Sequence, residues 1–378
     1  MIRVLLVGAG GYAKGYIQEL LGSTDPDLRW EGIVEPYFER CVQKEEIATR
    51  GIPVYGTMEE FYAAHGAELA IICTPTYLHR EHSICALAHG SYVLCEKPAA
   101  PTVAAVEEMM AAEARYGKWI AIGYQWSYSE AMRALKQDVL AGCYGKPIAL
   151  KTAISWPRHL AYYSRGTGWA GKIERDGVMI LDSIASNACA HYLHNMLFLL
   201  GEDMESSATV TVEEGCCLRA NAIENFDTCS IRMRAGDASL YFVASHAVDK
   251  MRNPEFIYRF EEADLTYSQD EGSQVTAIRH DGTVKVYGDP FASSFRKLWE
   301  CVEAVRQGTK PVCTAKTALP HVRVIESLYR NFPVRDFPAE TVRFEEAKNR
   351  IVVDGLFDKI YRAYEHETSL CELIFEKS

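Results

Sequence analysis

The feature that most constrains this chain is a glycine-rich turn placed directly between a strand and a helix. An apolar run, Ile2–Val7, leads into Gly8-Ala9-Gly10-Gly11-Tyr12-Ala13, and a helical pattern follows to about Leu21. Gly8 permits a tight turn, Gly10 lets the backbone approach a pyrophosphate, and the small Ala13 lets the helix pack close to its strand. The helix N-terminus offers free N–H groups to an anion. The arrangement predicts a dinucleotide-binding turn at the edge of a parallel sheet.

An acidic residue follows where such a turn needs a partner. Glu35 ends the next strand pattern, about 20 residues after the turn, where an acid would hold the ribose 2′-hydroxyl. A carboxylate there repels a 2′-phosphate, and no Arg or Lys follows before Arg40. NAD is therefore predicted over NADP.

Strand and helix patterns alternate through the first third of the chain. This alternation predicts a doubly wound parallel sheet, a Rossmann domain, over residues 1–125. Thr57 and Glu60 predict a capping box at the start of one helix. The expected helices cover 39–50, 58–65, 78–89 and 103–116, and the expected strands cover 53–55, 69–73, 91–95 and 119–124.

The strand at 91–95 runs into Glu96-Lys97-Pro98. A lysine at the carboxyl edge of a parallel strand lies where open α/β sheets bind their ligands. Partial desolvation there lowers a lysine pKa and allows proton exchange near neutral pH. The Lys97-Pro98 bond could be cis. Taken alone, Lys97 is better interpreted as an ordinary surface lysine, and the motifs around it change that interpretation.

After Tyr124 the pattern changes to many strands with few helices between them, which predicts a largely antiparallel, open sheet in an α+β domain over residues 126–378. Asp281-Gly282 predicts a hairpin. An open sheet face on this domain predicts a dimer or tetramer. The expected helices cover 130–141, 295–307, 318–329 and 356–365, and the expected strands cover 148–155, 208–212, 218–223, 229–234, 240–245 and 257–260.

Composition excludes some classes of partner. The formal net charge of −11 argues against nucleic-acid binding, which needs a basic face. None of the 12 cysteines forms a Cys-x-x-Cys pair, several lie in apolar runs, and the chain begins directly with a strand, so we expect a reduced, cytoplasmic protein. No run approaches the roughly 20 apolar residues of a membrane span. His79 and His82 share a helix face but lack an evident third ligand, so no metal is expected.

Four stretches together resemble the glucose–fructose oxidoreductase/inositol dehydrogenase/MocA (Gfo/Idh/MocA) family. They are Val7 to Ala13, Cys73-Thr74-Pro75-Thr76-Tyr77-Leu78-His79, Gly90 to Pro98, and Trp119 to Gln125. The resemblance implies NAD(P)-dependent oxidoreduction of a sugar, polyol or related compound, with Lys97 as the catalytic lysine. The cofactor contacts that it implies fall on Gly8, Gly10, Gly11, Tyr12, Ala13, Glu35, Thr74, Pro75, His79, Glu96, Lys97, Gln125 and Trp169.

The second domain admits two alignments with the family's Asp-x-x-x-His element. Counting back from Leu199-Leu200-Gly201 places the histidine at His191 and Asn187 at the acid position, one helical turn away. In this alignment Asp182 only caps the helix. The other alignment makes Asp182 the acid and puts Ser186 at the histidine position. His191 and His194 could also be ordinary helix histidines.

A long segment between these elements, residues 156–169, is rich in aromatic residues and arginines. Aromatic faces suit sugar C–H surfaces, and arginines supply planar donors to hydroxyls or a carboxylate. The alternative is an interdomain aromatic cluster. Trp169 resembles a family tryptophan close to the cofactor, although Ala170 stands where an arginine commonly follows. The substrate-binding candidates are Lys97, Tyr124, Trp156, Arg158, Tyr163, Arg165, Asn187 and His191.

Two other functions use the same residues. One is a redox-neutral cleavage of a glycosidic bond with transient oxidation of the sugar. The other is a non-catalytic dinucleotide sensor, for which a proton acceptor at Lys97 would be superfluous.

Overall fold

The structure is a computed structural model that describes residues 1–165 and 168–375. The chain divides into two compact units. The first comprises Met1–Tyr128 and Ser293–Leu319, and the second comprises Ser129–Ala292 and Pro320–Ser378.

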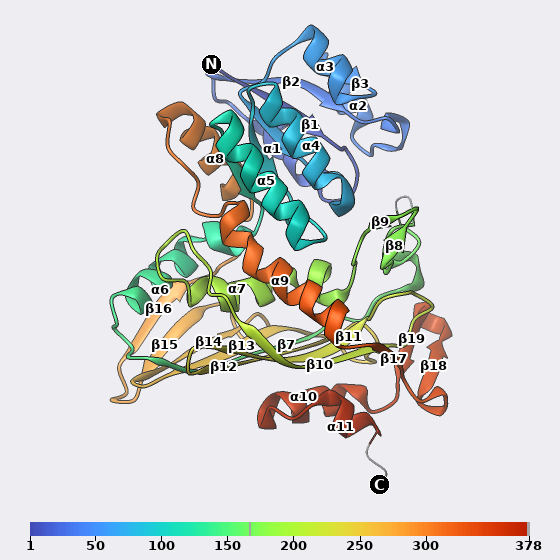
Figure 1. The fold of residues 1–378 in the computed structure, drawn as a ribbon, viewed down its shortest axis with the longest axis vertical. Helices are drawn as coiled ribbons and strands as arrows, with labels where there is room; N and C mark the ends of the chain where they lie inside the picture. Colours follow the sequence, from blue (N-terminus) through green and yellow to red (C-terminus); the bar gives the residue numbers. More distant parts are fainter. Residues whose placement is uncertain (166–167, 376–378) are drawn as a thin grey trace. The chain divides into compact units, whose positions relative to one another are not determined.

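The first unit contains a six-stranded, fully parallel sheet in the order β3-β2-β1-β4-β5-β6, with helices on both faces (Figure 1). This confirms the predicted Rossmann architecture. Its elements are β1 (Ile2–Val7), α1 (Ala13–Gly22), β2 (Leu28–Val34), η1 (Phe38–Arg40), α2 (Lys44–Thr49), β3 (Val54–Tyr55), α3 (Met58–Ala64), β4 (Leu69–Ile72), η2 (Thr76–Leu78), α4 (His79–Ala88), β5 (Tyr92–Cys95), α5 (Val103–Tyr116), β6 (Ile120–Ile122), η3 (Gln125–Tyr128) and α8 (Arg296–Gln307).

Local sequence signals explain several of these boundaries. The capping box predicted for α3 is present, with Thr57 accepting from the Glu60 backbone and the Glu60 carboxylate accepting from the Thr57 backbone. Helix α5 begins after the capping residue Thr102 and ends at Gly117, which adopts the left-handed conformation that glycine tolerates.

Two helix predictions in this unit need correction. The helix expected over 39–50 is broken into η1 and α2, because Cys41 adopts an extended backbone and its side chain enters the core. Helix α8, which we assigned to the second domain, packs into the core of the first unit through Leu298, Cys301 and Val302.

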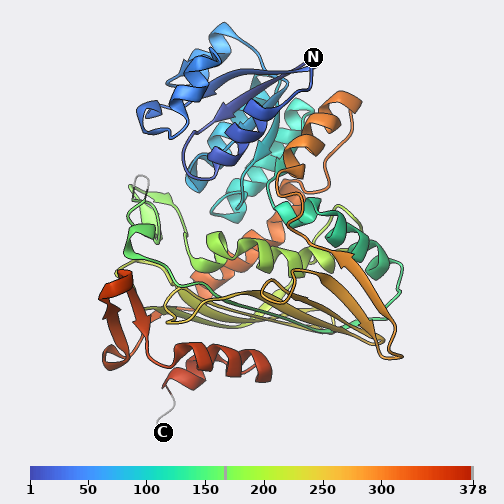
Figure 2. The ribbon, with the colours of Figure 1, turned by 180° about the vertical axis from the view of Figure 1, so that it is seen from behind.

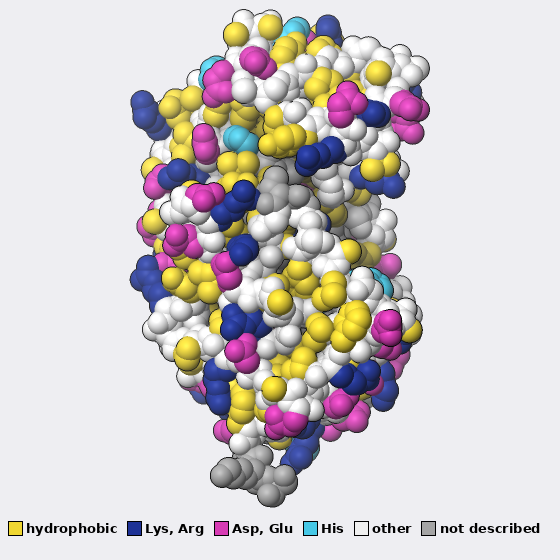
Figure 3. All heavy atoms as spheres, turned by 90° about the vertical axis from the view of Figure 1, so that its right-hand side faces the viewer, with side chains coloured by type: hydrophobic (Ala, Val, Ile, Leu, Met, Phe, Trp, Pro, Cys, Tyr) yellow, Lys and Arg dark blue, Asp and Glu magenta, His cyan; other side chains and the backbone are white. Residues whose placement is uncertain are grey.

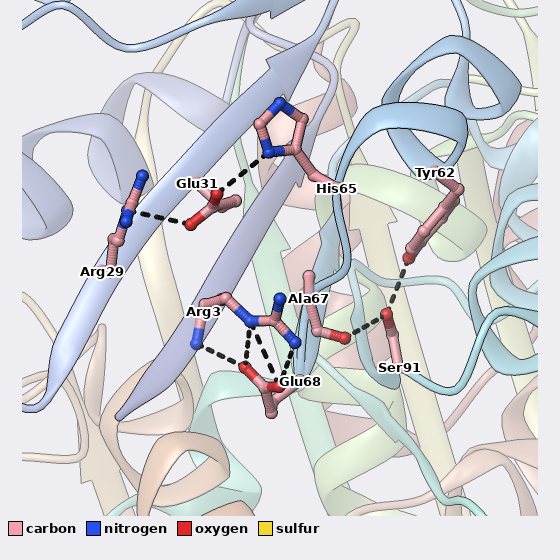
Figure 4. A network of polar contacts seen from close by, with 8 residues as sticks. All are labelled: Arg3, Arg29, Glu31, Tyr62, His65, Ala67, Glu68 and Ser91. Atoms are coloured by element: carbon pink, nitrogen blue, oxygen red, sulfur yellow. Dashed lines mark hydrogen bonds and ion pairs between the residues drawn. The ribbon is translucent and has the colours of Figure 1, made fainter.

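The amino edge of the parallel sheet is closed by polar contacts (Figure 4). Arg3 of β1 pairs with Glu68, which immediately precedes β4, at 2.6 Å. Glu31 of β2 contacts the His65 ring at 3.0 Å. Ser91, just before β5, donates to the Ala67 carbonyl at 2.7 Å. Open α/β sheets bind their ligands at the opposite, carboxyl edge of their strands.

The second unit contains a nine-stranded mixed sheet, ordered β16-β15-β14-β13-β7-β12-β11-β10-β17, in which only the β7–β12 and β10–β17 pairs are parallel. This confirms the predicted, largely antiparallel sheet. Helices α6, α7 and α9 cover one face, and α10 and α11 lie on the other (Figures 1 and 2).

The elements of the second unit are α6 (Glu130–Leu140), β7 (Pro147–Ser155), η4 (Leu160–Tyr162), β8 (Glu174–Arg175), β9 (Val178–Met179), η5 (Ile184–Ala188), α7 (Ala190–Leu199), β10 (Thr211–Arg219), β11 (Thr228–Ala235), β12 (Ala238–Ser245), β13 (Arg252–Phe260), β14 (Ala263–Ser268), β15 (Val275–Arg279), β16 (Val284–Gly288), β17 (Val334–Asp336), η6 (Ala339–Thr341), β18 (Val342–Glu345), η7 (Glu346–Lys348), β19 (Arg350–Val353), α10 (Leu356–His366) and α11 (Leu370–Phe375). Helix α9 (Ala315–Asn331) begins in the sequence of the first unit and continues in that of the second.

The predicted hairpin at Asp281-Gly282 is confirmed between β15 and β16. The two strands expected over 208–212 and 218–223 are instead the single strand β10. Its acidic middle does not break it, because Glu213 pairs with Arg234 at 2.5 Å and Glu214 with Arg232 at 3.5 Å across the β10–β11 ladder.

The expectation that every cysteine is reduced is wrong at one pair. Cys216 of β10 and Cys371 of α11 form a disulfide, with the Cα atoms 5.6 Å apart. The two lie 155 residues apart in sequence, so nothing in their local spacing indicated the bond. It ties α11 to the sheet face that α10 also covers.

Within the described residues, no helix is long and apolar enough to cross a membrane, and no three His, Cys, Asp or Glu side chains are arranged to hold a metal ion. On the face drawn in Figure 3, acidic and basic side chains are interspersed.

Candidate functional site

The glycine-rich turn lies at the carboxyl edge of β1. Gly8 has a φ of 90°, and a Cβ built on it would lie 2.9 Å from the Cys73 carbonyl oxygen, so only glycine fits there. A Cβ on Gly10 would meet open space, and Ala13 is fully buried where α1 begins. The first turn of α1 carries no acidic residue. The exposed backbone of the turn therefore fits an anionic ligand.

Glu35 is fixed beside this turn. Its carboxylate accepts from the Ala9 N–H and from the Tyr37 N–H, each at 2.9 Å. Because Val34 pairs with Val7 in the neighbouring strand, the acid at the end of β2 reaches the turn at the end of β1. This geometry fits a dinucleotide whose ribose hydroxyls approach Glu35.

His79 joins the ends of β4 and β5. Its side chain is buried, with Nδ1 2.8 Å from the Pro98 carbonyl oxygen and Nε2 2.8 Å from the Thr74 carbonyl oxygen. Burial lowers the pKa of His79, and the two carbonyl groups oppose that shift. The Lys97-Pro98 bond is cis. His79 therefore positions the Thr74-Pro75 turn and the backbone that carries Lys97, rather than presenting a free ring.

A buried ion pair supports the carboxyl ends of β5 and β6. The Lys297 ammonium, from α8, donates to the Glu96 carboxylate and to the Gly123 carbonyl, the latter at 3.2 Å. The Tyr16 hydroxyl donates to Glu96 at 2.7 Å, and the Lys97 N–H donates to it at 3.2 Å. Burial opposes ionisation of Glu96, but the Lys297 charge and these donors hold its pKa below the usual value. Burial likewise opposes the charge on Lys297, and Glu96 raises the Lys297 pKa.

The remaining predicted residues of the first unit have different environments. Tyr12 is exposed, donates to Gln125 Oε1 at 3.1 Å and stacks on Phe295 with ring centroids 5.6 Å apart. Tyr124, a candidate substrate contact, is completely buried in the core. Lys97 is half-buried.

In the second unit, the structure brings Asp182 and Asn187 together. Asp182 accepts from the Asn187 side-chain amide at 2.9 Å and from the Gly171 N–H at 2.6 Å. The helix cap that we assigned to Asp182 belongs instead to Ser183, whose hydroxyl accepts from the Ser186 N–H at 3.2 Å. His191 follows in the first turn of α7 and is half-buried.

The aromatic and arginine segment follows β7 and contains η4. Trp156 donates through Nε1 to the Asn253 side chain at 2.9 Å. The Arg165 guanidinium lies over the Tyr162 and Trp169 rings, and the Arg158 guanidinium lies over Trp156 and Tyr162. Tyr163 is half-buried on the same loop. Gly166 and Thr167 of this segment lie outside the described residues.

The sequence of the first unit matches a family model. Residues 2–124 match the GFO_IDH_MocA family, described as an oxidoreductase family with an NAD-binding Rossmann fold. This unit is a Gfo/Idh/MocA-family NAD(P)-binding domain. The match covers β1 to β6 and includes Glu96-Lys97-Pro98, so the resemblance inferred from four motifs is confirmed.

Curated proteins that are similar to this chain are named as sugar and polyol enzymes. The chain is 26% identical over 183 residues to a 1,5-anhydro-D-fructose reductase of Ensifer adhaerens, covering 48% of this chain and 51% of the relative. It is 30% identical over 158 residues to an inositol 2-dehydrogenase of Burkholderia cenocepacia, covering 42% of each chain. The matched region thus spans about half the length of these relatives.

Solved structures share the fold over most of the chain. The WlbA dehydrogenase from Bordetella pertussis, in complex with NADH and UDP-GlcNAcA, superposes with a TM-score of 0.70 at 19% identity and covers 87% of this chain and 95% of its own. KijD10, a 3-ketoreductase from Actinomadura kijaniata in complex with NADP and TDP-benzene, gives a TM-score of 0.71 at 14% identity and covers 89% and 99%.

Sequence reasoning missed two residues that support the carboxyl edge of β5, where Glu96 and Lys97 lie. Tyr16 and Lys297 both contact Glu96, yet Tyr16 looked like a core residue of α1 and Lys297 lies 201 residues from its partner. The available signal was a lysine at 297, next to Leu298, within an otherwise apolar helix face.

Proposed function

We propose that this protein is an NAD-dependent oxidoreductase that moves a hydride between nicotinamide and a hydroxyl-bearing carbon of a sugar, polyol or related compound. The observation that carries the proposal is the placement of Lys97 at the carboxyl edge of β5. It follows Glu96, which Lys297 holds in place, and precedes Pro98, whose carbonyl contacts His79. The names of the curated relatives support the substrate class.

Lys97 is assigned as the general base in the oxidative direction and as the general acid in reverse. When bound, NAD supplies the hydride acceptor. The Lys97 amine takes the proton from the substrate hydroxyl, and the adjoining Glu96 carboxylate already accepts from Tyr16, Lys297 and the Lys97 N–H.

His191, in the first turn of α7, and Asn187, in the preceding η5, are the assigned substrate-binding and proton-relay pair, on two successive elements and not on one helix as the alignment predicted. The other alignment needs Ser186 in place of the histidine, but the Ser186 hydroxyl already donates to the Leu181 carbonyl at 2.8 Å and lies buried at the start of η5. Asp182 is occupied by Gly171 and Asn187, which supports a role in orienting Asn187.

NAD is the proposed cofactor, because Glu35 faces the glycine turn and would repel a 2′-phosphate. Solved relatives of this fold include an NADH complex and an NADP complex, so the preference has to be measured on this protein.

The test is a screen of sugars and polyols for net NADH formation, followed by Lys97→Ala. We expect that variant to lose a factor on the order of 10² to 10⁴ in rate while NAD binding persists. Lys44→Ala is the matched control, since Lys44 pairs with Glu39 at 3.0 Å on the surface of the same unit. Cleavage of a glycoside without net NADH would indicate the redox-neutral reaction. Tight NAD binding with no turnover of any compound would indicate a sensor.

A further inference from the structure

The backbone of residues 156–160, which begins the aromatic and arginine segment, makes three hydrogen bonds to other parts of the second unit. The Trp156 N–H donates to the Ser245 carbonyl at 2.9 Å, the Arg158 N–H to the His246 carbonyl at 3.2 Å, and the Leu160 N–H to the Asn349 carbonyl at 2.9 Å. These hydrogen bonds fix the backbone that carries Arg158 and leads to Tyr162.

Two guanidinium groups share the Tyr162 ring. The Arg165 Cζ lies 3.6 Å from its centroid and the Arg158 Cζ lies 5.1 Å from it. Each also lies over a tryptophan, at 4.9 Å for Arg165 over Trp169 and 5.3 Å for Arg158 over Trp156. Stacking engages the flat face of a guanidinium and leaves its N–H edge for an oxyanion in the same plane.

Neither arginine has a carboxylate partner within residues 1–165 and 168–375. The Arg158 Nε is buried with no hydrogen-bond partner in that part of the chain. Arg165 donates to a neutral group, the Tyr162 carbonyl, at 2.6 Å. Two half-buried cations beside one ring repel each other, so an anion that joins them would be bound favourably.

Asp182 and Asp227 are the acids that act electrostatically on Tyr162 and Tyr163, and each accepts hydrogen bonds from neutral groups. Asp182 accepts from Gly171 and Asn187. Asp227 is fully buried and accepts from Asn221 and Thr228, at 2.8 and 3.1 Å for their side chains, and burial raises its pKa. The neighbouring His246 is also buried, and burial together with the Arg158 charge lowers its pKa to about 3, so it remains neutral near pH 7. Two guanidinium groups beside one carboxylate, Asp182, leave a net positive charge near Tyr162.

We propose that Arg158 and Arg165 form an oxyanion site that selects substrates carrying a carboxylate or phosphate group. The proposal rests on the proposed function, because it names the class of sugar that the enzyme takes. The rings of Trp156, Tyr162 and Trp169 hold the two guanidinium groups, and the substrate's anionic group supplies the missing counter-charge.

The test is calorimetric titration of the full chain, saturated with NAD, with D-glucuronate, D-glucose 6-phosphate and D-glucose. We expect at least one anionic sugar to bind about 10- to 100-fold more tightly than glucose, the range for hydrogen bonds to charged groups. Arg158→Gln and Arg165→Gln should each remove most of that preference, and Arg165→Lys should restore it only in part. Arg175→Gln, at an exposed arginine of the same unit, is the control and should keep it.

The two anions distinguish the source of the oxyanion. Preference for glucuronate alone indicates a carboxylate, and preference for the phosphate alone indicates a phosphate ester. Glucose binding as tightly as both anions, no detectable binding of either anion, or an equal loss for glucose and glucuronate in both Gln variants would overturn the proposal.

Net NADH formation separates this proposal from the function on which it rests. Turnover of neutral sugars without an anionic preference would keep the oxidoreductase and reject the oxyanion site. Selective anion binding without turnover of any compound would keep the site and reject the oxidoreductase.

Discussion

The buried Glu96–Lys297 pair allows a quantitative test of how much this pair contributes to the stability of the fold next to Lys97. Lys297 is fully buried and Glu96 is 7% exposed, so Lys297→Met leaves a carboxylate in the core with only the Tyr16 hydroxyl and the Lys97 N–H as donors. Breaking a buried pair from one side costs about 3–5 kcal/mol, whereas replacing both partners by neutral groups is often nearly neutral. The double variant Glu96→Gln/Lys297→Met should therefore be more stable than Lys297→Met alone.

The measurement is guanidinium denaturation of the four proteins of this double-mutant cycle, followed by circular dichroism at pH 7. We expect the sum of the losses in free energy of unfolding for the two single variants to exceed the loss for the double variant by at least about 2 kcal/mol. A Lys297→Met variant within about 1 kcal/mol of the parent would refute the reasoning, because the carboxylate would then not need its cation.

The sign of the pH dependence provides a second check on the same pair. In the parent, the lowered pKa of Glu96 means that its contribution is present above the unfolded-state pKa and is lost as pH falls through the folded value. Without Lys297, burial would raise the Glu96 pKa, so the folded variant would take up a proton more readily than the unfolded chain. The stability deficit of Lys297→Met should shrink as pH falls from 7 towards about 5.

Four further predictions follow from other sites. NAD should bind more tightly than NADP in a fluorescence titration and Glu35→Ser should narrow the gap, whereas stronger NADP binding by the parent would contradict the role of Glu35. His191→Ala should lose a factor on the order of 10² to 10⁴ in turnover with NAD binding intact. Asp182→Asn should lower turnover much less, because Asp182 contacts Asn187 and the Gly171 N–H and is not assigned a proton-transfer role; the reverse pattern would make Asp182 the family acid. Burial lowers the pKa of His246 from 6.5 to about 3, so between these two pH values only the unfolded chain takes up the His246 proton. The free energy of unfolding should therefore decrease by up to about 5 kcal/mol as the pH falls from 6.5 to about 3. His246→Gln should flatten the melting temperature as a function of pH in this range, and an unchanged slope would exclude His246 as the cause. The exposed Ile257, Ile278, Val284 and Val286 share the sheet face beyond α10, so light scattering should show a dimer or tetramer, and a monomer at micromolar concentration would count against it.

Local signals in the sequence were sufficient for much of the fold. The glycine turn, the Thr57 capping box and the Asp281-Gly282 hairpin each depend on residues within a few positions of one another, and each is present. The order of the first sheet followed from the alternation of strands and helices.

The errors arose where distant parts of the chain decide the outcome. Cys41 breaks a predicted helix because its side chain enters a core built from other elements. Cys216 bonds to Cys371, 155 residues away in sequence, and Glu96 pairs with Lys297, 201 residues away. The cap predicted at Asp182 belongs to Ser183, which caps η5 because its hydroxyl accepts from the Ser186 N–H.

The late arrival of α8 has a consequence for synthesis on the ribosome. Lys297 emerges 201 residues after Glu96, a delay of about 10 to 40 s at typical translation rates of roughly 5–20 residues per second. The edge strand β6 also waits, because its Ile122 N–H donates at 2.8 Å to the carbonyl of Cys313, and Ala121 bridges to Thr314. Throughout that interval Glu96 lacks its cation and the nascent first unit carries an unpaired strand edge, which invites aggregation or binding by a chaperone.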